Sequence, residues 1–160
     1  MKTLRDWLNE YAVSHQNPTN KRLHWLCIPP IVFSVACALK AIPVGSDGLN
    51  AATIVGVLAL AYYLRLSWQL GVGLAVIFSA LYWGVLTLEA ALGTQAMLIV
   101  AAATFVLAWI GQFIGHHIEG AKPSFFKDLQ FLLIGPLWLL ADIYRRMSIP
   151  MGPGALPQRG

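Results

Sequence analysis

The sequence contains few charged residues. Asp, Glu, Lys and Arg account for 11% of its 160 residues, whereas an average globular chain carries about 25%. Hydrophobic residues account for 58%, and a soluble domain of this size could not cover them with a polar surface. Glycine and proline, with 14 and 9 residues, are too few and too scattered for collagen or low-complexity disorder. The composition excludes a disordered chain, a small secreted domain and a nucleic-acid-binding protein, and it predicts a small integral membrane protein.

Cysteine is also scarce. Cys27 and Cys37 lie in one apolar segment, where a helix would separate them by about 15 Å, too far for a disulfide. The net charge is only +4, and the basic residues occur in short clusters beside apolar stretches. Such clusters are typical of the cytoplasmic ends of membrane helices and of contact with anionic headgroups.

The N-terminal segment is polar, with apolar residues at helical spacing. Leu4, Trp7, Leu8 and Tyr11 would form one face of a short amphipathic helix. That helix could be an interfacial anchor or a lid over a site at the membrane surface, and the two roles are compatible.

Four apolar segments follow, at residues 23–41, 50–64, 66–92 and 95–114. Their lengths and short connections predict an all-α, up-and-down bundle of four transmembrane helices. Pro29 and Pro30 are expected to kink the first helix or delay its start. Residues 1–147 would form one membrane-embedded domain, and residues 148–160, rich in proline and glycine, a disordered tail.

The fifth apolar stretch, residues 125–141, is ambiguous, and the distribution of Lys and Arg helps to decide its path. With four spans and a cytoplasmic N-terminus, a fifth crossing would leave seven basic residues inside and four outside. A re-entrant or interfacial segment would leave ten inside and one outside, which fits the positive-inside bias better. We therefore expect a re-entrant or interfacial helical hairpin broken at Pro136. The protein would reside in the inner membrane of a bacterium or in the endoplasmic reticulum of a eukaryote.

All four histidines lie at the ends of predicted spans. His15 and His24 flank the start of the first span, and His116 and His117 follow the fourth. Four predicted crossings, an even number, separate the two pairs. The four histidines therefore lie on the same membrane face, predicted to be cytoplasmic. Imidazoles that converge there would suit Fe(II), Zn(II) or Mn(II), although interfacial histidines can also simply contact headgroups. Four histidines are too few for a di-iron enzyme with histidine boxes, whereas a mononuclear site fits.

Polar residues accompany these histidines. Asn17 and Asn20 lie between His15 and His24, and Gln112 and Glu119 lie about one helical turn on either side of His116. They could supply a carboxylate ligand or the hydrogen-bond acceptors that orient ligating imidazoles.

Two long stretches resemble a known family. Residues 15–29 read HQNPTNKRLHWLCIP, and residues 112–131 read QFIGHHIEGAKPSFFKDLQF and continue to Gly135-Pro136. Both resemble motifs of the membrane-bound 2-hydroxy fatty acid dioxygenases, the Mpo-like family first met in yeast, and the likeness covers nearly the whole chain. The sequence looks like the bacterial branch, because Cys27 stands where glycine is expected in yeast-type members.

The resemblance implies an Fe(II)-dependent α-oxidation that shortens a 2-hydroxy fatty acid by one carbon and releases CO2. The reaction R–CHOH–COOH + O2 → R–COOH + CO2 + H2O balances without NAD(P)H, flavin or 2-oxoglutarate. C2 loses three electrons and C1 loses one, and O2 takes up all four. The partners would be the 2-hydroxy fatty acid, O2 and membrane lipids, with no nucleic acid, and a homo-oligomer is compatible with the sequence.

The resemblance also implies site residues. His15, His24 and His116 match the motif histidines and are the expected iron ligands and catalytic centre. The doubled histidine adds His117 as a candidate fourth ligand, and Glu119 is a further catalytic candidate.

The substrate would need further contacts. Lys21, Arg22 or Lys122 could attract its carboxylate, although each could instead serve only to set the orientation of the helices in the membrane. Trp25, Phe113 and Phe125 could line a groove for the acyl chain or simply pack between helices.

Two other classes of function remain open at this stage. One is a non-catalytic membrane protein, such as a lipid-binding scaffold without a metal or a small transporter. A transporter would place ionisable groups at mid-membrane, whereas Arg65 and Glu89 lie near predicted helix ends. A zinc-dependent interfacial hydrolase would use the same histidines with different chemistry.

Overall fold

The fold consists of helices. The computed structural model describes residues 2–45, 49–120 and 125–152, and of residues 125–130 the backbone only. Its helices are α1 (Leu4–Val13), α2 (Pro18–Lys40), α3 (Ala51–Leu66), α4 (Trp68–Glu119) and α5 (Phe125–Arg146). No strand occurs in these three ranges, where Pro43 and Asn50 form a single isolated bridge. The predicted all-α class is confirmed.

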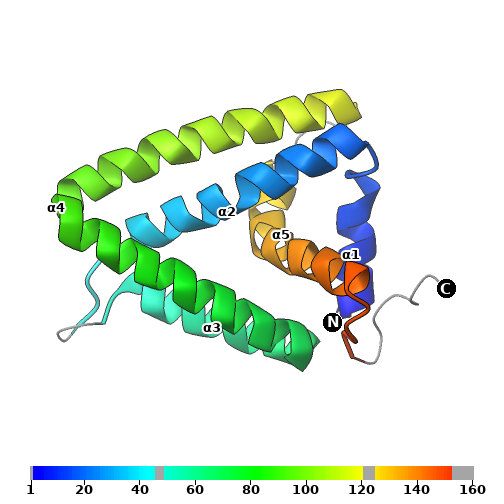
Figure 1. Cartoon of the computed structure of the whole chain (residues 1–160), viewed down its shortest axis with the longest axis horizontal. Coiled ribbons are helices and arrows are strands. Elements are labelled where there is room, and N and C mark those ends of the chain that lie inside the picture. The colour runs from blue at the N-terminus through cyan, green and yellow to red at the C-terminus, as the bar shows by residue number, and fades with distance from the viewer. Residues whose placement is uncertain (1, 46–48, 121–124, 153–160) are drawn as a thin grey trace.

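The helices form two layers that meet at one end. Figure 1 shows α4 folding back on itself, so that its second half lies along α2 and its first half along α3. The layers diverge from this corner, and α5 and α1 lie at the open end. This arrangement brings the C-terminal end of α4 next to the start of α2, which are separated by about a hundred residues in the sequence.

The corner of α4 lies at Gly93. This residue has φ 76° and ψ 162° and interrupts an otherwise helical stretch of 52 residues. Those angles lie in a region that is essentially restricted to glycine, so the break predicted between residues 92 and 95 is confirmed. Glu89 accepts hydrogen bonds nearby from Lys40 Nζ at 2.8 Å and from Thr94 Oγ1 at 3.0 Å.

Each of the first four helices starts at a capping side chain. Thr3 and Asp6 form a capping box at α1, and Asn17, Asn50 and Ser67 cap α2, α3 and α4. These side chains satisfy backbone N–H groups that have no partner inside the helix. Because Asn17 precedes a proline that suits the first helical position, α2 begins at residue 18, five residues before the predicted start.

Two helices continue through prolines, without the delayed start predicted from Pro29 and Pro30 or the break predicted at Pro136. Pro29 and Pro30 lie inside α2, and Pro136 lies inside α5, so the hairpin predicted at Pro136 is wrong. A proline within a helix disturbs the hydrogen bonds of the preceding carbonyl groups. The carbonyl of Leu133, the residue after the one whose carbonyl loses its helical donor to Pro136, accepts a hydrogen bond from Tyr63 Oη at 2.5 Å.

The main core lies where α1 and α5 meet the layers. Leu4, Leu8 and Tyr11 of the predicted amphipathic face are buried together with Ile134 and Leu137 of α5, so that prediction is confirmed. Packing also holds the first part of the predicted tail: Met151 is buried and its carbonyl accepts a hydrogen bond from Ser67 Oγ at 2.7 Å. The rest of that prediction concerns residues 153–160, which lie outside the described ranges.

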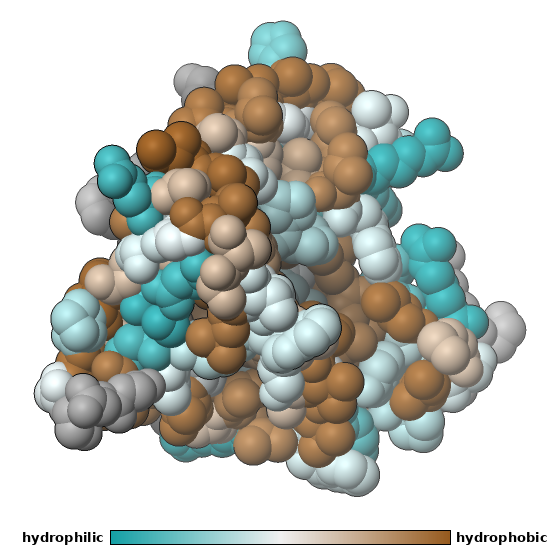
Figure 2. Space-filling model, turned by 60° about the vertical axis from the view of Figure 1, so that its left-hand side comes forward, coloured by the Kyte–Doolittle hydropathy of each residue, from teal (hydrophilic) through white to brown (hydrophobic). Residues whose placement is uncertain are grey.

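The outer surface is strongly apolar. Leu58, Ile99 and Leu107 are between 64% and 69% exposed, and apolar residues cover much of the face drawn in Figure 2. Soluble proteins rarely expose such extensive apolar surface. Within the described ranges, α2 and α4 are long and apolar enough to cross a membrane. The arrangement with four spans stays a prediction from the sequence.

Candidate metal centre

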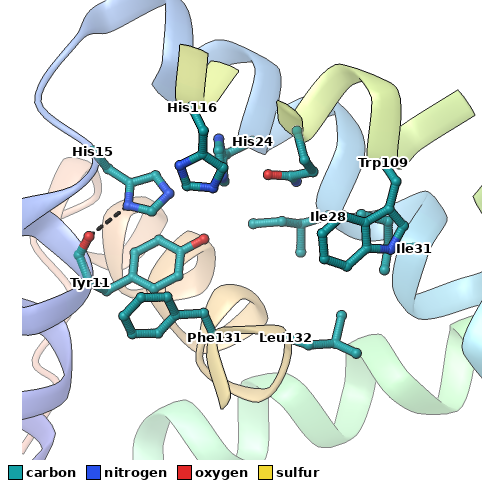
Figure 3. Close-up of a pocket in the computed structure, with 10 residues that line it drawn as sticks. Tyr11, His15, His24, Ile28, Ile31, Trp109, His116, Phe131 and Leu132 are labelled. Carbon is teal, nitrogen blue, oxygen red and sulfur yellow. Dashed lines mark hydrogen bonds between the residues drawn. The ribbon is translucent and has the colours of Figure 1, made fainter. Parts of the chain in front are cut away.

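Three histidines from separate parts of the chain meet near the open end of the layers. His15 follows the end of α1, His24 lies in the second turn of α2, and His116 lies in the last turn of α4. All three are buried, and one ring nitrogen from each lies within 4.8 Å of the others. Figure 3 shows the three side chains close together at one end of the cavity. The predicted convergence of these three residues is therefore present in the fold.

The hydrogen bonds of two rings leave one nitrogen of each directed away from the backbone. Nδ1 of His15 is 2.6 Å from the carbonyl oxygen of Tyr11, and Nδ1 of His24 is 3.0 Å from that of Asn20. A carbonyl can only accept, so both Nδ1 atoms carry the proton. Nε2 of each ring then keeps a lone pair, which is the usual arrangement of a metal-binding histidine.

The unpaired ring nitrogens fit a metal ion. Nε2 of His15 and Nδ1 of His116 are buried and have no hydrogen-bond partner among the described residues. Buried polar atoms of this kind are costly, and a bound cation would satisfy them. Metal–nitrogen bonds of about 2.1 Å place two ligand nitrogens at most about 4.2 Å apart. The present limit of 4.8 Å therefore requires only a small side-chain movement on binding.

Burial also sets the protonation state of His15. Burial lowers the pKa of this ring from 6.5 to about 4 and outweighs the hydrogen bond to Tyr11, which raises the pKa. The charges of His116 and Lys21 lower the pKa a little further. His15 is therefore neutral near pH 7, as a metal ligand must be.

Glu119 holds the loop that carries His15. Its Oε1 accepts a hydrogen bond from Gln16 N at 2.7 Å, and its Oε2 accepts bonds from Asn17 N at 2.9 Å and Asn20 Nδ2 at 3.0 Å. The carboxylate thus ties the end of α4 to the start of α2. Its oxygen atoms are engaged by these donors, and Glu119 lies outside the group of three histidines whose ring nitrogens meet.

The asparagines support the same connection. Asn17 caps α2 through a hydrogen bond from Thr19 N at 2.8 Å. Asn20 is fully buried. Its side-chain Nδ2 donates to the backbone carbonyl of Ser14 at 3.0 Å, and its backbone carbonyl lies against Nδ1 of His24. The predicted role of both residues, orienting metal ligands, stays a prediction.

A small cavity of about 40 Å³ opens beside the three histidines. Gln112 lines it, and the aromatic rings of Tyr11, Trp109 and Phe131 complete much of the wall (Figure 3). The ring of Tyr11 stacks on that of His15 with centroids 4.1 Å apart. The remaining lining residues are apolar: Ile28, Ile31 and Leu132.

Sequence reasoning missed these aromatic residues, although two of them left a signal. Tyr11 precedes His15 by four positions, and Trp109, Gln112 and His116 have the spacing of one helical face. Phe131 had no such signal, because only the path of α5 brings it to the site.

The structure does not bring every predicted residue to the site. His117 is exposed, since consecutive residues point about 100° apart around a helix. Lys21 is half-buried and Lys122 lies outside the described residues. Of the aromatics predicted to line an acyl groove, Trp25 packs against the main core and Phe113 is 50% exposed. The side chain of Phe125 is outside the described part of the chain.

Comparisons with known proteins agree with this site. A family model described as "2-hydroxy-palmitic acid dioxygenase Mpo1-like" matches residues 1–147. The chain is 27% identical over 147 residues to a Saccharomyces cerevisiae protein named 2-hydroxy-palmitic acid dioxygenase MPO1, covering 91% of this chain and 82% of the yeast protein. No solved structure gives a significant match. The family match covers all five helices and the three histidines, and the chain therefore belongs to the Mpo1-like family.

Proposed function

We propose that this protein is an Fe(II)-dependent membrane dioxygenase that converts a 2-hydroxy fatty acid and O2 into CO2, water and the fatty acid one carbon shorter. The observation that carries the proposal is the buried cluster of His15, His24 and His116, with two rings already oriented by backbone carbonyls. Membership of the Mpo1-like family and the name of the yeast relative support the substrate class.

The three histidines would hold the iron, which when bound supplies the one-electron chemistry that O2 requires. The chain's other residues keep this site in place and limit access to it. Glu119 and Asn20 fix the ligand loop, and the walls of the cavity exclude bulk water from the reacting end of the substrate. Gln112 is the polar side chain that lines the cavity beside the histidines.

The balance of the reaction explains why the site needs no other cofactor. The bond between C1 and C2 breaks, C2 becomes the new carboxyl carbon, and C1 leaves as CO2. The four electrons released reduce O2. Only the substrate, O2 and the metal then have to reach the cavity.

The site would lie at the cytoplasmic face of the membrane. In this arrangement α2, α3 and the two halves of α4 cross the bilayer, and α1 and α5 lie at the face that carries the histidines. Lys21 and Lys122 are the candidate cations for attracting the fatty acid carboxylate to this boundary.

The test uses the full chain purified in detergent, stripped of metal and reconstituted anaerobically with Fe(II) or with Zn(II). We expect 2-hydroxypalmitate to cause equimolar O2 uptake and formation of pentadecanoate with Fe(II) only. His116→Ala should abolish turnover, and His117→Ala, which alters the neighbouring exposed residue, should preserve it. Product formation with Zn(II), or full activity of His116→Ala, would contradict the proposal.

A further inference from the structure

A second and larger cavity lies between the two layers. Its volume is about 460 Å³, and it is lined by α2, α3, the first half of α4 and α5. None of the described residues that line it is charged. Two hydroxyl groups at its wall are already engaged, because Tyr63 Oη donates to Leu133 and Tyr82 Oη accepts from Asn50 Nδ2 at 2.8 Å. The cavity therefore suits an uncharged, apolar ligand.

The cavity beside the histidines is too small for a fatty acid. A water molecule needs roughly 10–15 Å³ of such volume, so the 40 Å³ there have room for only a few atoms. The carboxyl end of a substrate can lie at the histidines, but its chain must leave this space.

The two cavities lie next to each other. Leu132 of α5 lines both, and on α2 the lining passes from Ile31 at the histidine cavity to Val32 at the large one. Figure 3 shows Ile31 and Leu132 on the side of the small cavity away from His15. A chain that left the histidines between these side chains would therefore reach the large cavity next.

The length of the large cavity matches that of a lipid chain. On α3 its lining extends from Ala52 to Tyr63, and at 1.5 Å per residue this stretch measures about 16 Å. The hydrocarbon part of one membrane leaflet is about 15 Å thick, half of the bilayer core. The acyl chain of a membrane-derived fatty acid therefore fits along the cavity.

We infer that the large cavity between the layers binds the acyl chain of the 2-hydroxy fatty acid while its carboxyl end lies at the histidines. This inference rests on the proposed function. It places the chain between α2, α3 and α5 instead of beside Trp25 and Phe113, where the sequence alone suggested a groove. The size of the large cavity then sets which chain lengths the enzyme accepts.

Gly56 provides a direct test. It lines the cavity, and a Cβ atom placed on it meets no atom within 4 Å, so Gly56→Phe would fill the cavity without a backbone clash. The control is Leu58→Phe, because Leu58 is 64% exposed on the same helix and does not line the cavity. We expect Gly56→Phe to lower the ratio of kcat/KM for 2-hydroxypalmitate to that for 2-hydroxyhexanoate by at least about tenfold. Leu58→Phe should leave this ratio unchanged. An unchanged ratio in Gly56→Phe, with the protein still folded, would overturn the inference.

Photo-crosslinking tests the same site without turnover. Full-length protein in lipid vesicles would be illuminated with a 2-hydroxy fatty acid that carries a diazirine at its methyl end, and labelled peptides identified by mass spectrometry. We expect labels within residues 32–39 and 52–63 that excess 2-hydroxypalmitate removes. Labels around Phe113 would overturn the inference. A phospholipid that carries a diazirine is the control. If it labels the cavity equally and excess 2-hydroxypalmitate does not displace it, the cavity is a crevice for bulk lipid and the inference is also overturned.

The two experiments separate this inference from the proposed function. Competed labelling of the cavity in a protein that does not turn over the substrate would support the acyl site and contradict the dioxygenase reaction. Turnover with chain-length selectivity that Gly56→Phe does not alter would support the reaction and contradict the acyl site.

Discussion

Gly115 of α4 lies against Asn20 of α2 so closely that a Cβ atom on Gly115 would be 2.4 Å from Oδ1 of Asn20. One turn earlier, a Cβ atom on Gly111 would be 2.5 Å from Sγ of Cys27. Small residues four positions apart allow two membrane helices to approach closely. This approach is what brings His116, the residue after Gly115, to the histidine cluster.

Replacement of Gly115 by alanine should therefore damage the site. The new methyl group must displace Asn20 or separate the helices, and such overpacking costs about 1–3 kcal/mol of the free energy of unfolding. We expect a lower Tm and loss of most metal binding, measured by thermal unfolding in detergent and by metal analysis. Gly84→Ala is the matched control, since its Cβ would meet only Phe33 at an ordinary 3.5 Å. Normal metal binding in Gly115→Ala would contradict the role given to this contact.

The neighbouring histidines of α4 should behave differently. His116 contributes a buried nitrogen to the cluster, whereas His117 is exposed. We expect His116→Ala to lose bound Fe(II), and Co(II) as its spectroscopic substitute, while His117→Ala retains both at the level of the unaltered protein. Metal content per chain and the Co(II) absorption spectrum would measure this. Equal losses in the two variants would show that the metal lies elsewhere.

Glu119 should influence metal affinity without binding the metal. Glu119→Gln keeps one acceptor oxygen but places an NH2 group against donors, and a hydrogen bond to a charged group contributes about 1.5–3 kcal/mol. We expect the Fe(II) or Co(II) affinity to fall about 10- to 100-fold, as is usual when a residue that orients ligands is altered. Titration with Co(II) measures this loss.

The control for that experiment is Glu10→Gln. Glu10 pairs with Lys2 on the exposed side of α1, and surface pairs contribute little, so the metal affinity should not change. Complete loss of binding in Glu119→Gln, with a Tm equal to that of the unaltered protein, would instead indicate that Glu119 is a ligand.

The buried state of His15 predicts how the metal-free protein responds to acid. Its pKa is lowered from 6.5 to about 4 in the folded protein, so between these values the unfolded chain binds a proton that the folded protein does not. Stability therefore decreases as the pH falls from 6.5 to 4, by up to about 3 kcal/mol from this group. We expect the Tm of protein in EDTA to fall across this range, and to fall less in His15→Asn. A Tm that rises on acidification would contradict the assignment.

The helices and the histidine pairing could be predicted from the sequence because both follow from local rules. Apolar segment lengths and chain breaks located α3 and both halves of α4, and the position of the histidines at the ends of apolar segments suggested that His15, His24 and His116 could meet. The start of α2 was missed because the cap at Asn17 was not weighed against the apolar pattern.

The errors concern features that depend on packing between distant segments. α5 continues through Pro136, and its Leu133 carbonyl contacts Tyr63, seventy positions earlier in the sequence. The hydrogen bonds of Glu119 were also out of reach of the sequence, because spacing cannot show that Gln16 N and Asn17 N donate to its oxygens. The large cavity left no sequence signal, since four separate helices line it with ordinary apolar residues.

The corner at Gly93 permits a last prediction, about the architecture that creates that cavity. A side chain at φ 76° and ψ 162° is strained, and such strain costs on the order of 1–3 kcal/mol, so Gly93→Ala should lower the Tm in detergent. Gly56→Ala is the control, because its Cβ meets no atom and alanine favours a helix, so its Tm should be unchanged or higher. If α4 were instead one straight helix in the membrane, Gly93 would occupy an ordinary helical position and Gly93→Ala would stabilise the protein as Gly56→Ala does. A rise in Tm for Gly93→Ala would therefore remove the fold-back of α4 and, with it, the two layers that enclose the cavity.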